Sequence, residues 1–280
     1  MKNKKVAIVY DFDGTLSPGN MQEYDFIPSV GRKNEEFWEQ SNRLAEEQDA
    51  DPILVYMWRM IREAQSNDVP IHRDSFVESG RKIGLFPGVR EWFSRINAYG
   101  AQMGLEVEHY INSSGIKEMI EGTVIANEFK QIYACSFLYD VNDVAIWPAV
   151  SVNYTNKTQF IFKINKGIDS VYESKLINQF VPEEERPVQF RNIIYFGDGT
   201  TDIPCMKLVK EKNGHSIAVY NPESEHGLSS IKKLVDDNRV NYVCGADYRE
   251  GGELDRLVKS IIDKIHADNV LQEFMDDSRR

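Results

Sequence analysis

Two acidic residues follow the first apolar segment of the chain directly. Residues 5–10 are mainly apolar, and Asp11, Phe12, Asp13 and Gly14 come immediately after them. A strand presents alternate side chains on one face, so Asp11 and Asp13 are expected to emerge together at the end of a strand over 5–10. Two neighbouring carboxylates repel each other unless a cation or a proton intervenes. The pair therefore suits a hard divalent cation beside a reactive carboxylate.

Calcium-binding EF-hand loops also contain an Asp-x-Asp pair followed by glycine. Such a loop needs an oxygen ligand at its fifth position, glycine at its sixth and glutamate at its twelfth. Counted from Asp11, this chain has Thr15, Leu16 and Gln22 at those positions. The preceding segment also reads as a buried strand rather than a helix. The EF-hand interpretation is therefore disfavoured, and a surface turn rich in Asp and Gly is the plainest alternative.

Two later segments also end predicted strands with polar residues. Residues 105–111 lead to Ser113, and residues 191–196 lead to Asp198 within the segment Gly-Asp-Gly-Thr-Thr-Asp. Ligands of open α/β sheets bind at the carboxyl ends of the strands. We therefore expect Asp11, Ser113 and Asp198 to converge on one edge of a sheet.

The elements that position these residues alternate between strands and helices, which predicts an α/β fold with a mainly parallel sheet. Residues 17–83 interrupt the alternation with a helical insert. Asp51 and Pro52 there have the residue types of an N-cap and a first helical position. The sequence predicts helices over 34–48, 52–64 and 72–83.

The segment after the second strand is rich in strand-forming residues. It predicts strands over 123–125, 131–139, 144–147 and 150–154, with a helix that begins at Lys166 before Gly167 and Ile168.

Composition limits the class of partner. The chain has 280 residues, and its 33 basic and 44 acidic residues give a net charge of −11. This charge argues against nucleic acid or an anionic membrane surface as a partner. The three cysteines have no disulfide or zinc spacing, and no apolar run reaches the length of a membrane span. We expect a soluble, cytoplasmic protein that is a monomer or a homodimer.

Four segments in chain order resemble the motifs of the haloacid dehalogenase (HAD) superfamily of phosphohydrolases. They are the Asp11 to Thr15 segment, the strand ending at Ser113, a lysine, and the segment over 197–202. The helical insert resembles the C1-type cap of phosphoserine phosphatases. The resemblance implies a Rossmann-like doubly wound parallel sheet, with a catalytic core of residues 1–16 and 84–280 and an α-helical cap of residues 17–83.

The resemblance also implies roles for the acidic residues. Asp11 is expected to attack phosphorus and form an aspartyl-phosphate, while Asp13 protonates the leaving oxygen and then activates water. Asp198, Asp11 and the backbone carbonyl of Asp13 are expected to bind Mg²⁺, and Asp202 to complete or orient the site.

Phosphate binding is assigned by the same resemblance. Ser113 is expected to donate a hydrogen bond to the phosphoryl group, with Ser114 as the competing choice and Gly115 completing the phosphate-binding segment. A lysine is expected to balance the negative charge of the phosphoryl group. We assign this lysine to Lys166, with Lys163 as the second choice and Lys157 as a further neighbour.

The function implied is a Mg²⁺-dependent phosphatase for a small phosphorylated metabolite. A phosphotransferase or phosphomutase would use the same residues, and a non-catalytic sensor of Mg²⁺ or phosphate is a further alternative. The resemblance to phosphoserine phosphatases also implies a glutamate and an arginine in the insert that grip the substrate, and the candidates are Glu23 for the carboxylate and Arg59 or Arg62 for the cation.

Overall fold

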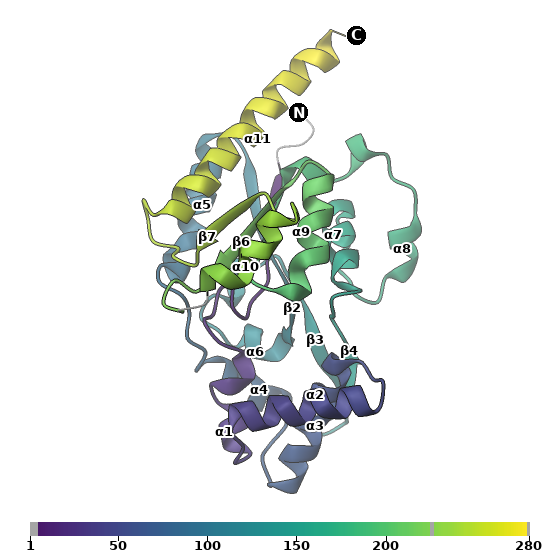
Figure 1. Cartoon of the computed structure of the whole chain (residues 1–280). Helices are drawn as coiled ribbons and strands as arrows, with labels where there is room; N and C mark the ends of the chain where they lie inside the picture. The colour runs from purple at the N-terminus through teal and green to yellow at the C-terminus, as the bar shows by residue number, and fades with distance from the viewer. Residues whose placement is uncertain (1–4, 225–226, 279–280) are drawn as a thin grey trace.

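The computed structural model describes residues 5–224 and 227–278 (Figure 1). Within these residues, seven strands form one sheet in the order β4-β3-β2-β1-β5-β6-β7. Neighbouring strands are parallel, except that β4 runs antiparallel to β3. The strands are β1 (Lys5–Tyr10), β2 (Glu106–Ile116), β3 (Gln131–Tyr139), β4 (Ala145–Val150), β5 (Ile193–Gly197), β6 (His215–Tyr220) and β7 (Tyr242–Gly245).

The α-helices lie on both faces of this sheet and at one end of it (Figure 1). They are α1 (Phe26–Ser29), α2 (Asn34–Glu47), α3 (Pro52–Ser66), α4 (Arg73–Gly80), α5 (Val89–Gln102), α6 (Lys117–Glu121), α7 (Lys157–Lys166), α8 (Ser174–Asn178), α9 (Ile203–Glu211), α10 (Gly227–Asp236) and α11 (Glu253–Asp277). Short 3-10 helices are η1 (Met21–Glu23), η2 (Ala126–Glu128), η3 (Glu183–Glu185), η4 (Phe190–Asn192) and η5 (Thr200–Asp202).

The two faces of the sheet can be traced from adjacent residues of β5. Phe196 packs edge-on against Trp92 of α5, with ring centroids 6.4 Å apart. Its neighbour Tyr195 donates a hydrogen bond to Asp202, just before α9. Because successive side chains of a strand point to opposite faces, α5 and α9 cover opposite faces of the sheet. The predicted doubly wound α/β fold is confirmed.

The central strand explains why the first segment is continuously apolar. Residues 6–10 of β1 are fully buried, with β2 on one side and β5 on the other. A strand covered on both faces has no solvent-facing side to fill with polar residues. The carboxylates therefore appear only where β1 ends. No helix among the described residues is both long enough and apolar enough to cross a membrane.

Helices α1 to α4 gather at one end of the molecule (Figure 1), and we call this part, residues 17–83, the helical lobe. The β3-β4 hairpin also reaches it, because Ala145 donates a backbone hydrogen bond of 2.9 Å to Ile71. Phe76 of α4 stacks on Phe137 of β3 at a centroid distance of 5.2 Å. A segment far along the chain therefore supports the helical lobe. The division into a core and a cap at residues 16 and 84 stays a prediction.

Three parts of the strand-rich segment differ from the prediction. The strand predicted over 150–154 is absent, because β4 ends at Val150 and residues 151–156 lie in the loop before α7. Residues 123–125 are not a strand but part of the turns between α6 and η2. Residues 157–166 form α7, whereas the sequence predicts a helix that begins only at Lys166, the last residue of α7. The apolar residues Phe160, Ile161 and Ile164 of α7 are buried on one face at helical spacing. Their aromatic and β-branched side chains imitate a buried strand, which caused the error.

Helix α4 contacts α6 through two glycines. A Cβ atom on Gly80 would lie 2.0 Å from the Met119 carbonyl oxygen, and one on Gly122 would lie 2.0 Å from that of Val77. Both obstacles are backbone atoms, so the two helices must separate to admit a methyl group. This close approach fixes the helical lobe against the segment that follows β2.

Substituting Gly80→Ala should therefore lower the free energy of unfolding by about 2 kcal/mol, as overpacking of a tight contact does. Urea unfolding followed by circular dichroism measures the change. The control is Glu78→Ala on the same helix, where the side chain is 61% exposed. The control should shift stability by less than about 0.5 kcal/mol. Equal effects of the two substitutions would contradict the close packing.

Candidate active site

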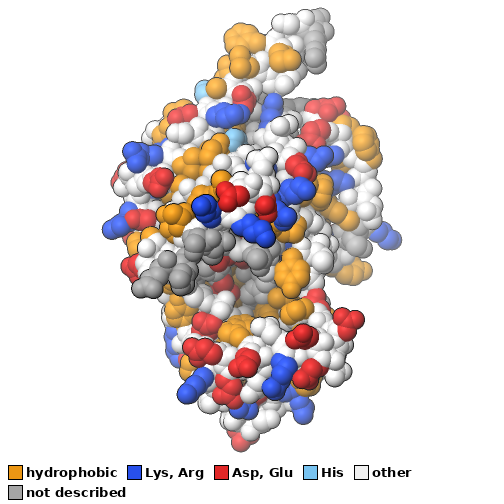
Figure 2. Space-filling model, in the orientation of Figure 1, with side chains coloured by type: hydrophobic (Ala, Val, Ile, Leu, Met, Phe, Trp, Pro, Cys, Tyr) orange, Lys and Arg blue, Asp and Glu red, His pale blue; other side chains and the backbone are white. Residues whose placement is uncertain are grey.

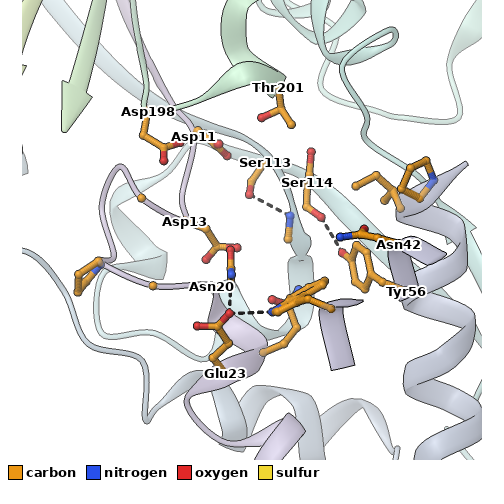
Figure 3. A pocket seen from close by; sticks show the side chains of 18 residues that line it. Asp11, Asp13, Asn20, Glu23, Asn42, Tyr56, Ser113, Ser114, Asp198 and Thr201 are labelled. Atoms are coloured by element: carbon orange, nitrogen blue, oxygen red, sulfur yellow. Dashed lines mark hydrogen bonds between the residues drawn. The ribbon is translucent and has the colours of Figure 1, made fainter. Parts of the chain in front are cut away.

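Three strand ends from distant parts of the sequence meet at one cavity. Asp11 directly follows β1, Asp198 directly follows β5, and Ser113 lies near the carboxyl end of β2. All three line a cavity of about 470 Å³ between the sheet and the helical lobe (Figure 3). Because β2, β1 and β5 are neighbours in the sheet, their ends bring these side chains together.

Asp11 is held in place by a hydrogen bond to one carboxylate oxygen and an ion pair with the other. Its Oδ1 accepts a bond of 2.8 Å from the backbone N–H of Phe12, and its Oδ2 lies 3.1 Å from Lys157 Nζ. Burial, together with the nearby Asp202 carboxylate, raises the pKa of Asp11 above its usual range even though Lys157 opposes the shift. The carboxylate is thus oriented and poorly hydrated, as a nucleophile should be.

Lys157, and not Lys166, is the lysine of this cluster. Lys157 Nζ is fully buried and donates a hydrogen bond of 2.7 Å to Asp202 Oδ1. Burial disfavours its charge, but Asp11 and Asp202 outweigh burial and hold the pKa of Lys157 above its usual range. Our assignment to Lys166 is corrected, since Lys166 Nζ instead donates to the backbone carbonyls of Ile177 and Gln179.

The error follows directly from the misplaced helix. Lys157 is the first residue of α7 and Lys166 is the last, so they lie at opposite ends of the same helix. Lys163, our second choice, donates to the Ser170 carbonyl at 2.8 Å and is also outside the cluster. The Lys157 carbonyl accepts a hydrogen bond of 3.1 Å from Asn112, which fixes the start of α7 beside β2.

Asp11, Asp198 and Asp202 form a group that could hold a cation. One ligand atom from each lies within 4.8 Å of the others. Asp202 Oδ1 accepts hydrogen bonds from Lys157 and from the Tyr195 hydroxyl at 2.6 Å. Its Oδ2 is buried and has no hydrogen-bond partner in the part of the chain that the structure describes. An unpaired buried carboxylate oxygen is costly, and these hard oxygen donors fit Mg²⁺.

Small residues make room for these carboxylates. Gly14 adopts a φ of +73°, and a Cβ atom there would lie 2.0 Å from Asp198 Oδ2. At Gly197, a Cβ atom would lie 2.4 Å from Asp202 Cγ. Any larger residue would displace a carboxylate, so the glycines beside Asp13 and Asp198 allow the cluster to be compact.

Asp13 lies on the same cavity but outside the three-carboxylate group. Its Oδ1 accepts a hydrogen bond of 2.9 Å from the backbone N–H of Met21. Burial and the neighbouring Asp11 raise the pKa of Asp13 well above its usual range. A raised pKa favours the protonated form of the carboxyl group, which is the form that a general acid needs.

The predicted phosphate-binding segment lies in an irregular part of β2. Asn112 pairs with Tyr133 and Ile116 pairs with Cys135, so Ser113, Ser114 and Gly115 leave the regular ladder. Such irregularities redirect side chains at functional sites. All three residues line the cavity.

The two serines differ in their hydrogen bonds. Ser113 Oγ accepts a bond of 3.0 Å from the Gly115 N–H. The buried Ser114 Oγ has no partner among the described residues. Either hydroxyl remains a candidate phosphoryl ligand.

The two arginines predicted to grip the substrate do not line the cavity. Arg59 is buried inside the helical lobe, where it donates to the Phe37 carbonyl and to Glu63. Arg62 is on the surface and donates to Gln65. Their assignment follows from the resemblance to phosphoserine phosphatases, which implies an arginine in the insert, and the sequence leaves the orientation of their helix open. Glu23, in contrast, lines the cavity.

Several lining residues were not assigned a site role from the sequence. Trp38, Asn42 and Tyr56 of the helical lobe face the cavity, as does Asn20 in the loop after β1. Trp38 and Asn42 are four residues apart on α2, and such residues share one face of a helix. That spacing is the signal that could have indicated Asn42, but only once the face of α2 toward the core was known.

Comparison with known proteins identifies the family to which this chain belongs. A scan against protein families matches residues 8–207 to the haloacid dehalogenase-like hydrolases. An uncharacterized protein of Borreliella burgdorferi is 29% identical over an alignment of 282 residues. The match covers 89% of this chain and 93% of that protein.

Solved structures share the fold at low sequence identity. A HAD family hydrolase from Salmonella enterica has a TM-score of 0.57 and 16% identity, and the match covers 87% of this chain and 68% of the other. The structure of a phospho-aspartyl intermediate analogue of phosphoserine phosphatase has a TM-score of 0.55 and 15% identity. That match covers 92% of this chain and 99% of the other.

The position of Lys157 generates a stability prediction. Lys157→Met should leave two buried carboxylates without their counter-charge and lower the free energy of unfolding by about 3 kcal/mol or more. Lys166→Met, which removes hydrogen bonds to two carbonyls, should cost about 1 kcal/mol. Denaturant unfolding in the presence of a chelator compares the two variants. An equal cost for both would contradict the charge-compensating role of Lys157.

Proposed function

This chain belongs to the haloacid dehalogenase-like hydrolases, and from this premise we propose that it is a Mg²⁺-dependent phosphatase. It would hydrolyse phosphomonoesters of small metabolites through an aspartyl-phosphate formed on Asp11. The observation that carries the proposal is the arrangement of Asp11, which lies beside a buried lysine and two further carboxylates at the base of a cavity.

The attack on phosphorus falls to Asp11. Its carboxylate is fixed by the Phe12 N–H and by Lys157, so little reorientation is needed before the P–O bond forms. Mg²⁺, held by Asp11, Asp198 and Asp202, would offset the repulsion between this anionic nucleophile and an anionic ester. Lys157 contributes positive charge from the buried side of the cluster.

Proton transfer falls to Asp13. With its raised pKa, Asp13 retains a proton that it can give to the leaving oxygen as the ester bond breaks. The resulting carboxylate can then take a proton from the water that hydrolyses the aspartyl-phosphate. Its hydrogen bond from Met21 N–H holds the carboxyl group toward the cavity during both steps.

Replacement of the nucleophile tests the reaction. Asp11→Asn should reduce phosphate release from para-nitrophenyl phosphate in the presence of Mg²⁺ by about 10³-fold or more, because an amide cannot form the covalent intermediate. Asp74→Asn, a change at an exposed position on α4, is the matched control and should retain wild-type turnover. Turnover by Asp11→Asn at the rate of the control would refute the covalent mechanism.

Binding of Mg²⁺ should depend on pH. Burial, with nearby carboxylates, raises the pKa values of Asp11 and Asp198 in the cation-free protein, so protons must leave before the cation binds. The raised values stabilise the cation-free fold at low pH, and this contribution is lost as pH rises through the folded-state pKa values. At higher pH, bound Mg²⁺ should stabilise the fold in place of these protons.

At a hundredfold excess over its Kd, Mg²⁺ should raise the melting temperature by about 5 to 10 °C at pH 8. The rise should be smaller at pH 5.5. Differential scanning fluorimetry with and without the ion isolates the effect from other titrating groups. Asp198→Asn should largely abolish the Mg²⁺-dependent rise. A shift that is independent of pH, or one that persists in this variant, would argue against the carboxylate site.

A further inference from the structure

The cavity has two chemically different ends. At the sheet end lie the carboxylates of Asp11 and Asp198 and the serines of β2. At the other end, the helical lobe contributes Glu23 and Tyr56 (Figure 3), and Trp38, which is hydrogen-bonded to Glu23, also lines the cavity. If the phosphoryl group occupies the sheet end, the alcohol part of the ester lies against the helical lobe. The side chains of that lobe therefore determine which alcohol fits.

Positive charge is missing where the alcohol part would lie. Among the described residues that line the cavity, none is Lys or Arg. Lys157 forms ion pairs with two carboxylates. Arg59 forms an ion pair with Glu63 and donates a hydrogen bond to a main-chain oxygen inside the helical lobe. A substrate with its own carboxylate would meet Glu23 without any counter-ion, which is unfavourable in a partly desolvated cavity.

Glu23 has one carboxylate oxygen available to a ligand. Its Oε1 accepts hydrogen bonds of 2.7 Å from Trp38 Nε1 and 2.6 Å from Asn20 Nδ2. No residue that the structure describes donates to its Oε2. The two hydrogen bonds to Oε1 fix the orientation of the carboxylate, so Oε2 keeps one position relative to the cavity. Figure 3 shows Glu23 on the same side of the cavity as Asp13 and Asn20.

Two aromatic rings lie next to this carboxylate. Trp38 and Tyr56 pack edge to face with their ring centroids 5.5 Å apart, and both line the cavity. The Tyr56 hydroxyl donates to the Ser114 carbonyl at 2.6 Å, which fixes its ring relative to β2. An ammonium group is attracted both to a carboxylate and to aromatic rings, so a cavity lined by Glu23, Trp38 and Tyr56 suits such a ligand.

The charge of the surrounding lobe favours the same kind of ligand. Residues 17–83 contain 13 acidic and 8 basic residues. Acidic side chains are prominent on this end of the molecule in the space-filling view (Figure 2). The resulting field repels anionic alcohol groups and attracts cationic ones toward the cavity.

We propose that the substrate is an amino-alcohol phosphate, whose primary amine or quaternary ammonium group lies between Glu23, Trp38 and Tyr56. The proposal rests on the phosphatase function proposed above and narrows it. Phosphoethanolamine and phosphocholine represent the class. Phosphoserine, which adds a carboxylate to phosphoethanolamine, represents the substrates that the cavity disfavours.

A matched set of esters tests the proposal with the wild-type protein and Mg²⁺. Phosphoethanolamine and phosphoserine differ only by a carboxylate, and glycerol 3-phosphate supplies a neutral alcohol of similar size. The kcat/KM for phosphoethanolamine or phosphocholine should exceed those for the other two by about tenfold or more. Higher kcat/KM for phosphoserine, glycerol 3-phosphate or a nucleoside 5′-monophosphate would overturn the proposal.

Variants of the helical lobe test the assigned residues. Glu23→Gln should raise KM for the ammonium esters by about tenfold and leave KM for glycerol 3-phosphate within about twofold. Trp38→Leu should act in the same direction, whereas Trp38→Phe keeps an aromatic face and should lose less. Glu39→Gln removes an exposed charge from α2 and is the matched control. Equal losses for neutral and cationic esters in Glu23→Gln would contradict a cation site.

The outcomes separate this inference from the function on which it rests. Hydrolysis of para-nitrophenyl phosphate that Asp11→Asn abolishes, without a preference for ammonium esters, would overturn the substrate class and retain the phosphatase. No Mg²⁺-dependent hydrolysis of any ester, in a folded protein, would overturn both.

Discussion

The group of three carboxylates, Asp11, Asp198 and Asp202, depends on the positive charge of the Lys157 ammonium group. Asp11, Asp198 and Asp202 come within 4.8 Å of one another in a buried place, where carboxylates repel strongly. Lys157 Nζ lies 3.1 Å from Asp11 and 2.7 Å from Asp202, and it is itself fully buried. Neither the lysine nor the carboxylates could remain charged there alone, since an unpaired buried charge is costly. The cluster is therefore a single electrostatic unit, in which the position of each member is set by the others.

The fold fixes the distances between the members of this cluster. Parallel strands β2, β1 and β5 end side by side, so Ser113, Asp11 and Asp198 need no long loop to meet. The start of α7 is tied to β2 by the hydrogen bond from Asn112 to the Lys157 carbonyl. The loop before α7 is tied to the helical lobe, because Asn153 donates to Asp51 at 2.5 Å. The same short segment thus connects the charged centre, the sheet and the lobe that covers the cavity.

The sequence predicted the parts of this site that follow from local pattern. The buried strand β1 and the residues after it, and the strand that leads to Asp198, are recognisable because a central strand must be apolar until it ends. The lysine was assigned incorrectly because α7 contains Phe160, Ile161 and Ile164, which a single sequence presents equally well as strand or helix. Arg59 was placed at the substrate because the family resemblance implies an arginine there, and the sequence does not show which residues of a helix face the cavity. Both errors required tertiary contacts for their correction.

Charge balance connects cation binding with the choice of substrate. With all groups ionised, the three carboxylates and Lys157 leave an excess of two negative charges, which one divalent cation would cancel. A phosphoryl dianion would then approach a neutral centre rather than an anionic one. Glu23 is not part of this balance, because its hydrogen bonds come from the neutral side chains of Trp38 and Asn20. Its charge therefore remains available to the alcohol part of the substrate. An ester that carries an anion at one end and a cation at the other matches this division of charge better than one with two anionic ends.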